Sequence, residues 1–290
     1  MDAKRIAITT DTNSGMFPGE MKEQGVFVLP MPFIIDGVSM LESVELSRDY
    51  FYEKLKSDSN ISTSQPSTAE VSDFWTGILK DYDEIVHIPT SSLLSNSCAT
   101  AQALAKDFNG KVRVVDNLRI SAPLKTSVFD AVKLRDEGKD TEEIAKILED
   151  SACEYSVYVS TESIHYLKKG GRISAAAAAI GSILKLRPVL HLFAGKLEKH
   201  ATPRTEQKSI EIMLNAIQSD LTERFKEFTD KGEMRIEVVY GEDKNATLPL
   251  LEEIQKRFPN IPVILNDPMS LSVACHTGPG SMAICCTRAL

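Results

Sequence analysis

The 290-residue sequence lacks the features that define several large classes of protein. Lysine and arginine number 33 against 41 aspartates and glutamates, so the formal net charge is −8. Nucleic-acid binding depends on an excess of basic side chains, and this balance therefore argues against nucleic acid as a general partner. The longest weakly polar run, residues 173–184, is too short to cross a bilayer. We therefore expect neither a nucleic-acid partner nor a transmembrane segment.

Cysteine is scarce and irregularly placed. The five cysteines form no C-x-x-C pair, and their odd number does not suit a disulfide framework. A reducing, cytoplasmic setting is the simpler interpretation. Polar residues at the beginning of the chain, among them Asp2, Lys4 and Arg5, lead directly into an apolar segment. We therefore expect no signal peptide.

Several motifs of catalysis and cofactor binding are also missing. Gly170-Gly171-Arg172 lacks the spacing of a Walker loop, and no Gly-x-Gly-x-x-Gly follows the first predicted strand. The chain has no Gly-x-Ser-x-Gly elbow of the kind that carries a nucleophilic serine. The five histidines have no closely spaced carboxylate or cysteine partners typical of a zinc site. We expect no metal and no cofactor.

What the sequence does contain is an alternation of short apolar segments with longer helical patterns. This alternation predicts βαβ units and a parallel sheet, and hence an α/β fold. The first part has predicted strands at 5–10, 26–31, 84–88 and 111–116, and predicted helices at 68–80, 98–108, 125–137 and 140–151. A second α/β unit has predicted strands at 157–160, 189–192, 196–200, 234–240, 263–265 and 282–286, and predicted helices at 205–231 and 246–257. We place the boundary near residue 155, giving domains 1–155 and 156–290.

A stretch rich in hydroxyl groups, Ile61 to Ser67, is the most informative segment of the first domain. Ser67 and Glu70 have the spacing of a capping box, which predicts that a helix begins directly after this stretch. The free N–H groups and positive dipole end of such a helix suit a carboxylate or phosphate. An ordinary polar loop before a capped helix is the alternative.

Three polar loops follow predicted parallel strands, and ligands bind beyond the carboxyl ends of such strands. These loops are residues 11–14, 62–67 and 90–97. Arg172, after paired glycines, is either a donor to an anion or a surface arginine after a helix end. His276 lies on a predicted tight turn, where it is a ligand contact, a general base or only a turn residue. A hydrolase or phosphotransferase that uses His276 with a loop serine is therefore an alternative to a binding protein.

Seven segments, in order along the chain, resemble those of the DegV family of bacterial fatty-acid-binding proteins, which includes the fatty-acid-binding subunit of fatty acid kinase. The segments are 9–12, 63–67, 91–95, 115–117, 167–173, 203–205 and 276–280. Each is weak alone, but their number and order are specific. Two residues depart from the family pattern: Asn96 replaces a glycine after the last loop serine, and Asn117 replaces a serine.

The resemblance implies a two-domain protein that holds one long-chain fatty acid between its domains. It also implies that the protein is a carrier and not an enzyme, and that it presents the carboxylate to an ATP-dependent kinase that makes acyl phosphate. Transient contact with a membrane is compatible with this role. The ligand-binding residues that it implies are Thr63, Ser64, Ser92, Ser95, Arg172, Arg204, His276 and Thr277. A regulatory protein whose cleft is filled by side chains is a third possibility.

Overall fold

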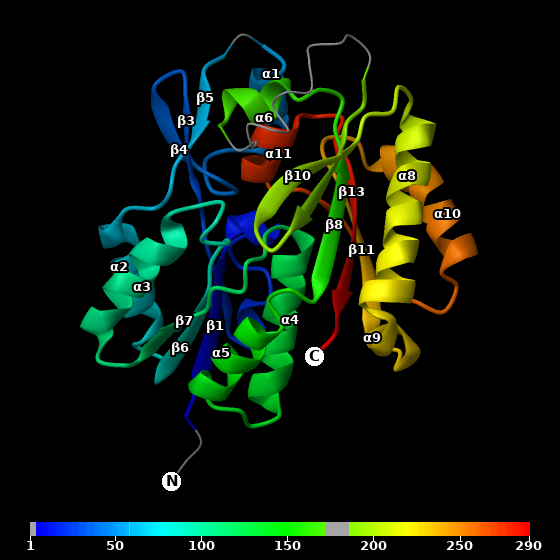
Figure 1. The fold of residues 1–290 in the computed structure, drawn as a ribbon. Coiled ribbons are helices and arrows are strands. Elements are labelled where there is room, and N and C mark those ends of the chain that lie inside the picture. The colour runs from blue at the N-terminus through cyan, green and yellow to red at the C-terminus, as the bar shows by residue number, and fades with distance from the viewer. Residues whose placement is uncertain (1–3, 58, 172–185) are drawn as a thin grey trace.

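Three β-sheets form the framework of the protein (Figure 1). The computed structural model describes residues 4–57, 59–171 and 186–290. The sheets have the strand orders β2-β1-β6-β7, β10-β9-β8-β13-β11-β12 and β4-β3-β5. The strands are β1 (Ile6–Asp11), β2 (Val26–Leu29), β3 (Pro32–Ile35), β4 (Val38–Leu41), β5 (Ile61–Thr63), β6 (Glu84–Ile88), β7 (Val112–Val114), β8 (Tyr155–Ser160), β9 (Val189–Phe193), β10 (Lys196–Ala201), β11 (Met234–Tyr240), β12 (Val263–Pro268) and β13 (Met282–Arg288).

The first sheet is parallel and is covered by helices on both faces, as the alternation of elements predicts. Its central strand β1 is buried at every position, which is typical of a parallel strand between two helical layers. The described helices of the chain are α1 (Arg48–Leu55), α2 (Thr68–Ile78), α3 (Ser97–Ala105), α4 (Ala122–Asp136), α5 (Thr141–Asp150), α6 (His165–Lys169), α8 (Glu206–Ser219), α9 (Lys226–Asp230), α10 (Leu248–Arg257) and α11 (Leu271–Thr277). Trp75 of α2 packs in the core on one face of this sheet, and Leu124 and Val128 of α4 pack on the other.

Helix α4 lies between the first sheet and the six-stranded sheet (Figure 1). It contacts β1 and β6 on one side and β11 and β13 on the other. The outer face of the six-stranded sheet is covered by α8 and α10, whose apolar side chains include Leu214, Ile217 and Ile254. This arrangement confirms the predicted α/β fold with a second sheet-containing domain. All strands of the six-stranded sheet come from residues 155–290, and the exact boundary near residue 155 remains a prediction.

Local sequence signals proved reliable. Ser67 accepts a hydrogen bond from the backbone N–H of Glu70, whose carboxylate accepts one from the backbone N–H of Ser67, and Asp140 forms the same box with Glu143. The predicted strands 189–192 and 196–200 form the hairpin of β9 and β10, whose turn is at residues 194–195. Its residues Ala194 and Gly195 have φ values of 47° and 70°, which match the twist of the flanking strands.

Non-local features differ from the sequence-based expectations. Residues 61–63 are not loop but form β5, which pairs with β3 in a small antiparallel sheet. Strands β3 and β4, which are absent from the sequence-based prediction, pair antiparallel and are joined by a turn at Asp36 and Gly37. The expected single helix 205–231 is interrupted by a π-turn at Asp220–Arg224. No helix among the described residues is long and apolar enough to cross a membrane.

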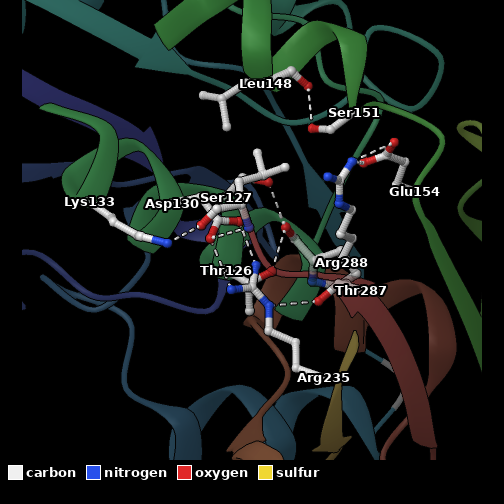
Figure 2. A network of polar contacts seen from close by, with 12 residues as sticks. Thr126, Ser127, Asp130, Lys133, Leu148, Ser151, Glu154, Arg235, Thr287 and Arg288 are labelled. Atoms are coloured by element: carbon white, nitrogen blue, oxygen red, sulfur yellow. Dashed lines mark hydrogen bonds and ion pairs between the residues drawn. The ribbon is translucent and has the colours of Figure 1, made fainter. Parts of the chain in front are cut away.

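A buried ionic network joins α4 to the six-stranded sheet (Figure 2). Arg235 of β11 donates two hydrogen bonds to the carboxylate of Asp130 on α4, at 3.0 and 2.5 Å, and a third to the Thr287 hydroxyl on β13 at 2.9 Å. Thr287 in turn donates to Glu237. Burial raises the pKa of Glu237 to about 8. The network therefore fixes α4 against the second sheet through paired rather than isolated charges.

Replacing Asp130 with alanine should leave Arg235 buried without the carboxylate that accepts two of its hydrogen bonds, while Glu237 remains 3.5 Å from its Nε. We expect the free energy of unfolding to fall by about 3–5 kcal/mol, the usual cost of breaking a buried ion pair from one side. Asp150→Ala removes the exposed pair with Lys146 and should change the free energy of unfolding far less, because water screens a surface ion pair. Denaturant unfolding of both variants measures the difference, and equal losses would contradict this account of the network.

Candidate functional site

A cavity of about 390 Å³ lies where the loops of the first sheet face the six-stranded sheet. Its polar wall comes from the ends of strands and from loops in the first domain, together with α11. The polar residues that line it are Asn13, Thr63, Ser64, Gln65, Thr90, Ser95, Asn96, Ser121, Ser272, His276 and Thr277. The three loops predicted to converge do so. The loops after β1 and β6 meet because these strands are parallel neighbours and end at the same edge, whereas residues 63–65 reach the cavity from β5 of the small antiparallel sheet.

The opposite wall is apolar and comes mainly from one face of the six-stranded sheet. Val157 and Val159 of β8, Leu192 of β9, Val239 of β11 and Ala283 of β13 line it and are all buried. These side chains point to the cavity because alternate residues of a strand share one face. At the polar wall, by contrast, Ser64 and Asn96 are exposed. The polar end is therefore the open end of the cavity.

Thr63 and His276 meet at the polar end. The Thr63 hydroxyl oxygen lies 3.2 Å from Nε2 of His276. Thr63 is placed by the pairing of β5 with β3, opposite Phe33. The turn predicted for His276 is wrong, because this residue belongs to the last turn of α11, a helix that packs on the small sheet through Leu271 and Ala274.

Ser95 lies at the same end, directly before α3. Its hydroxyl lies 2.9 Å from that of Ser97 and accepts a hydrogen bond from the Ser97 backbone N–H at 3.2 Å. Asn96 has φ −73° and ψ −5°, a right-handed conformation that needs no glycine. The substitution of Asn96 for glycine therefore costs the loop no strain. Asn117 is buried outside the cavity lining and accepts a hydrogen bond from the Arg119 backbone N–H.

A buried carboxylate supports the loops beneath the polar wall. Asp11 accepts hydrogen bonds from the Thr90 backbone N–H at 2.8 Å, the Thr90 hydroxyl at 2.9 Å and the Asn13 backbone N–H at 3.0 Å. Burial is the largest influence on this carboxyl and raises its pKa, while the bonds from Thr90 and Asn13 act in the opposite direction. Asn13 and Thr90 were found from sequence only as members of two loops, not as individual cavity residues.

The remaining residues implied by the family resemblance are placed differently. Thr277 lines the cavity, but its hydroxyl contacts the Val273 carbonyl and the Ser281 hydroxyl. Ser92 lines an open groove beside the cavity, formed with the β9–β10 hairpin. Arg204 is exposed before α8 and is not part of the cavity lining. Arg172 lies outside the described residues. Within the described ranges, no three His, Cys, Asp or Glu side chains could hold a metal ion.

Together the fold and the cavity define a class of protein: a two-domain α/β protein with an apolar cavity whose open end is lined by hydroxyl groups. Residues 5–289 match the DegV family, which is described as a family of uncharacterised proteins. The chain belongs to the DegV family.

Relatives from several bacteria match this chain over nearly their whole length, and solved structures among them share its fold. A DegV domain-containing protein of Streptococcus pneumoniae is 28% identical over 289 residues, covering 97% of this chain and 98% of the relative. A DegV family protein of Thermus thermophilus, described for its fatty acid binding, has a TM-score of 0.87 at 27% identity, covering 98% of this chain and 99% of that one. DegV of Bacillus subtilis, described as a fatty acid binding protein, has a TM-score of 0.83 at 25% identity, covering 99% and 100%.

Replacing Thr90 with valine keeps the shape of the side chain but removes the hydroxyl that donates to Asp11. At about pH 7 we expect the free energy of unfolding to fall by about 1–3 kcal/mol. The hydrogen bond from the Thr90 hydroxyl favours the ionised form of Asp11. The decrease in the free energy of unfolding should therefore become smaller as acid protonates Asp11. Urea unfolding at about pH 7 and about pH 4 tests this dependence. Thr68→Val, at an exposed position of α2, is the control, and a loss of equal size at both pH values would contradict the expectation.

Proposed function

We propose that the protein binds one long-chain fatty acid in this cavity and presents the carboxylate to a kinase partner. The observation that supports this proposal is the division of the cavity between hydroxyl groups beside its opening and a buried apolar wall. A fatty acid has the same division, with one anionic group at the end of an aliphatic chain. The descriptions of the Thermus thermophilus and Bacillus subtilis proteins as fatty acid binding support the same ligand class.

The energetics agree with this ligand. A volume of about 390 Å³ falls within the range of roughly 300–1,000 Å³ found for small-molecule sites. Each buried methylene contributes about 0.8 kcal/mol, so a tail of about sixteen carbons contributes on the order of 12 kcal/mol before the costs of binding. A hydrogen bond to the carboxylate adds about 1.5–3 kcal/mol. The tail therefore supplies most of the affinity, and the hydroxyl groups fix the orientation.

We assign the head group to Thr63, Ser95 and His276, with Ser64 beside them at the opening. In this assignment Nε2–H of His276 donates to the Thr63 oxygen, so that the Thr63 proton is directed to the carboxylate. A hydroxyl group has one proton and two lone pairs, which suits this relay position. The role of Thr277 is to support α11 through its bonds to Val273 and Ser281.

The kinase step transfers the γ-phosphoryl group of ATP to a carboxylate oxygen and yields an acyl phosphate and ADP. Hydroxyl donors at the open end leave one face of the carboxylate available for in-line attack. The chain itself acts as a carrier in this scheme and needs no cofactor. We place Arg204, Ser92 and Arg172 at the opening or on the surface that meets the kinase, and we place the reaction in the cytoplasm, where ATP is available.

The most direct test is the lipid content of the protein. Organic extraction of the purified chain followed by mass spectrometry should recover a fatty acid at close to one molecule per chain. If the protein is purified empty, it should take up an added long-chain fatty acid. Absence of both results would reject the proposal, and turnover of an ester by the isolated chain, abolished in His276→Ala, would favour the hydrolase alternative.

Replacing Thr63 with valine removes the hydroxyl from the polar end and keeps the volume of the side chain. We expect binding of a fluorescent fatty acid to weaken roughly tenfold, which corresponds to about 1.4 kcal/mol. Ser62→Ala is the matched control, because Ser62 is exposed in the same strand and lies outside the cavity lining. Equal affinities for Thr63→Val and the unaltered protein would reject the head-group assignment without rejecting the ligand.

A further inference from the structure

The buried carboxylate of Glu42 accepts hydrogen bonds from two segments that are far apart in the sequence, one near residue 12 and one near residue 271. Glu42 follows β4 and is 3% exposed. Its Oε2 accepts a hydrogen bond from the Thr12 hydroxyl at 2.7 Å, and its Oε1 accepts one from the backbone N–H of Leu271 at 2.6 Å. Thr12 follows β1, whereas Leu271 begins α11. This side chain therefore joins a loop of the first sheet to the helix that carries His276.

The hydrogen-bond pattern places a donor at each oxygen of Glu42. The Thr12 hydroxyl donates to Oε2 and itself accepts a hydrogen bond from the Met31 backbone N–H at 3.1 Å. The backbone N–H of Leu271 can only donate. An ionised carboxylate is acceptor-only and matches both donors, whereas a protonated carboxyl would place its proton on an oxygen that already faces a donor. The positive end of α11 favours the negative charge as well.

We propose that Glu42 is a positioning residue for the binding site: its ionised carboxylate holds α11 at the distance from the first-sheet loops that the head-group contacts need. Ser272, Val273, His276 and Thr277 of this helix line the cavity. A shift of α11 would move the imidazole of His276 away from the Thr63 hydroxyl. The inference rests on the proposed function for its ligand, but the contacts of Glu42 are independent of it.

The charges around Glu42 make this contact sensitive to pH. Burial is the main influence and raises the pKa of Glu42 to about 7, with Asp11 beyond Thr12 acting in the same direction. Arg48 of α1 lowers the pKa, and Tyr52 of the same helix also faces this group. Arg48 donates to the carbonyls of Met269 and Gly241, each at 2.7 Å. Because arginine stays charged, only Glu42 among these anchors of α11 changes its charge near neutral pH.

The ionisation of Glu42 should change folding stability and ligand binding in opposite directions as the pH changes. The folded pKa of about 7 lies above the ordinary value of 4.5, so the folded state binds more protons between these values. The contribution of Glu42 to folding stability is therefore largest in acid and falls as the pH rises through this interval. The ionised form that holds α11 increases over the same interval. Acid should thus weaken ligand binding while this group makes the fold more stable.

Titration with a fluorescent long-chain fatty acid tests the proposal. Between about pH 8 and about pH 6 the affinity of the unaltered protein should fall roughly tenfold. Glu42→Gln cannot ionise and should bind weakly at both pH values, with most of this pH dependence lost. Any pH effect that does not involve Glu42 is common to both proteins, so the difference between the two profiles isolates Glu42. Glu45→Gln is the matched control, because Glu45 is exposed in the same loop and also accepts a backbone N–H, from Leu41.

A measurement without ligand keeps the two proposals separate. Hydrogen–deuterium exchange of residues 269–281, corrected for the intrinsic rate, should be faster at about pH 6 than at about pH 8 in the unaltered protein. In Glu42→Gln the exchange of these residues should be fast at both pH values. Identical pH profiles of binding and exchange in the two proteins would overturn the role of Glu42, even if the fatty acid binds. If no fatty acid binds at any pH, the proposed function fails, and the exchange result alone decides the role of Glu42.

Discussion

The packing of α11 against the small three-stranded sheet is the constraint on which the site depends. Residues 271–277 come from the last part of the chain, yet their apolar face packs on Phe33 and Phe51. This contact brings His276 to Thr63 and closes the cavity on one side. Without it, the apolar face of the six-stranded sheet would be open to water, and the hydroxyl groups would have no imidazole beside them. The site is therefore a property of the assembled fold and not of either domain alone.

Buried carboxylates recur wherever this assembly joins separate parts of the chain. Asp11 orders two loops of the first sheet, Glu42 connects one of them to α11, and Asp130 pairs with Arg235 between α4 and β11. Each is costly to bury, and each is satisfied by hydrogen bonds from donors on another element. Such groups add little net stability compared with apolar residues of similar size, but their hydrogen bonds form in only one relative arrangement of the helices, strands and loops. The protein thus uses them where the position of the parts decides the shape of the cavity.

How much of this could be predicted from sequence depends on the range of the interactions concerned. The capping box of Ser67 and Glu70 is local, and it was correctly predicted. The convergence of the polar loops was also predicted correctly, but the parallel sheet explains only the loops after β1 and β6, since residues 62–67 reach the cavity through the antiparallel strand β5. The partner of Thr63 was not, because His276 lies 213 residues away and its helix has only seven residues. The strands β3, β4 and β5 are three or four residues long, and their pairing depends on α1 and α11 for its apolar cover. Glu42 has no sequence signature at all, because its role is set by donors on two distant segments.

Under the proposed function, the chemistry of the polar end explains why hydroxyl groups suit a carrier better than a buried cation would. A bidentate arginine would bind the carboxylate more strongly, but it would occupy both oxygens and neutralise the charge that makes them nucleophilic. Hydroxyl groups orient the carboxylate with single hydrogen bonds and leave a lone pair exposed. Ser64 and Asn96 are exposed at this end, which is where the proposed kinase partner would reach the head group. The affinity then has to come from the apolar wall, where Val157, Val239 and Ala283 are buried. Separating affinity from reactivity in this way allows a ligand to be held firmly and still react.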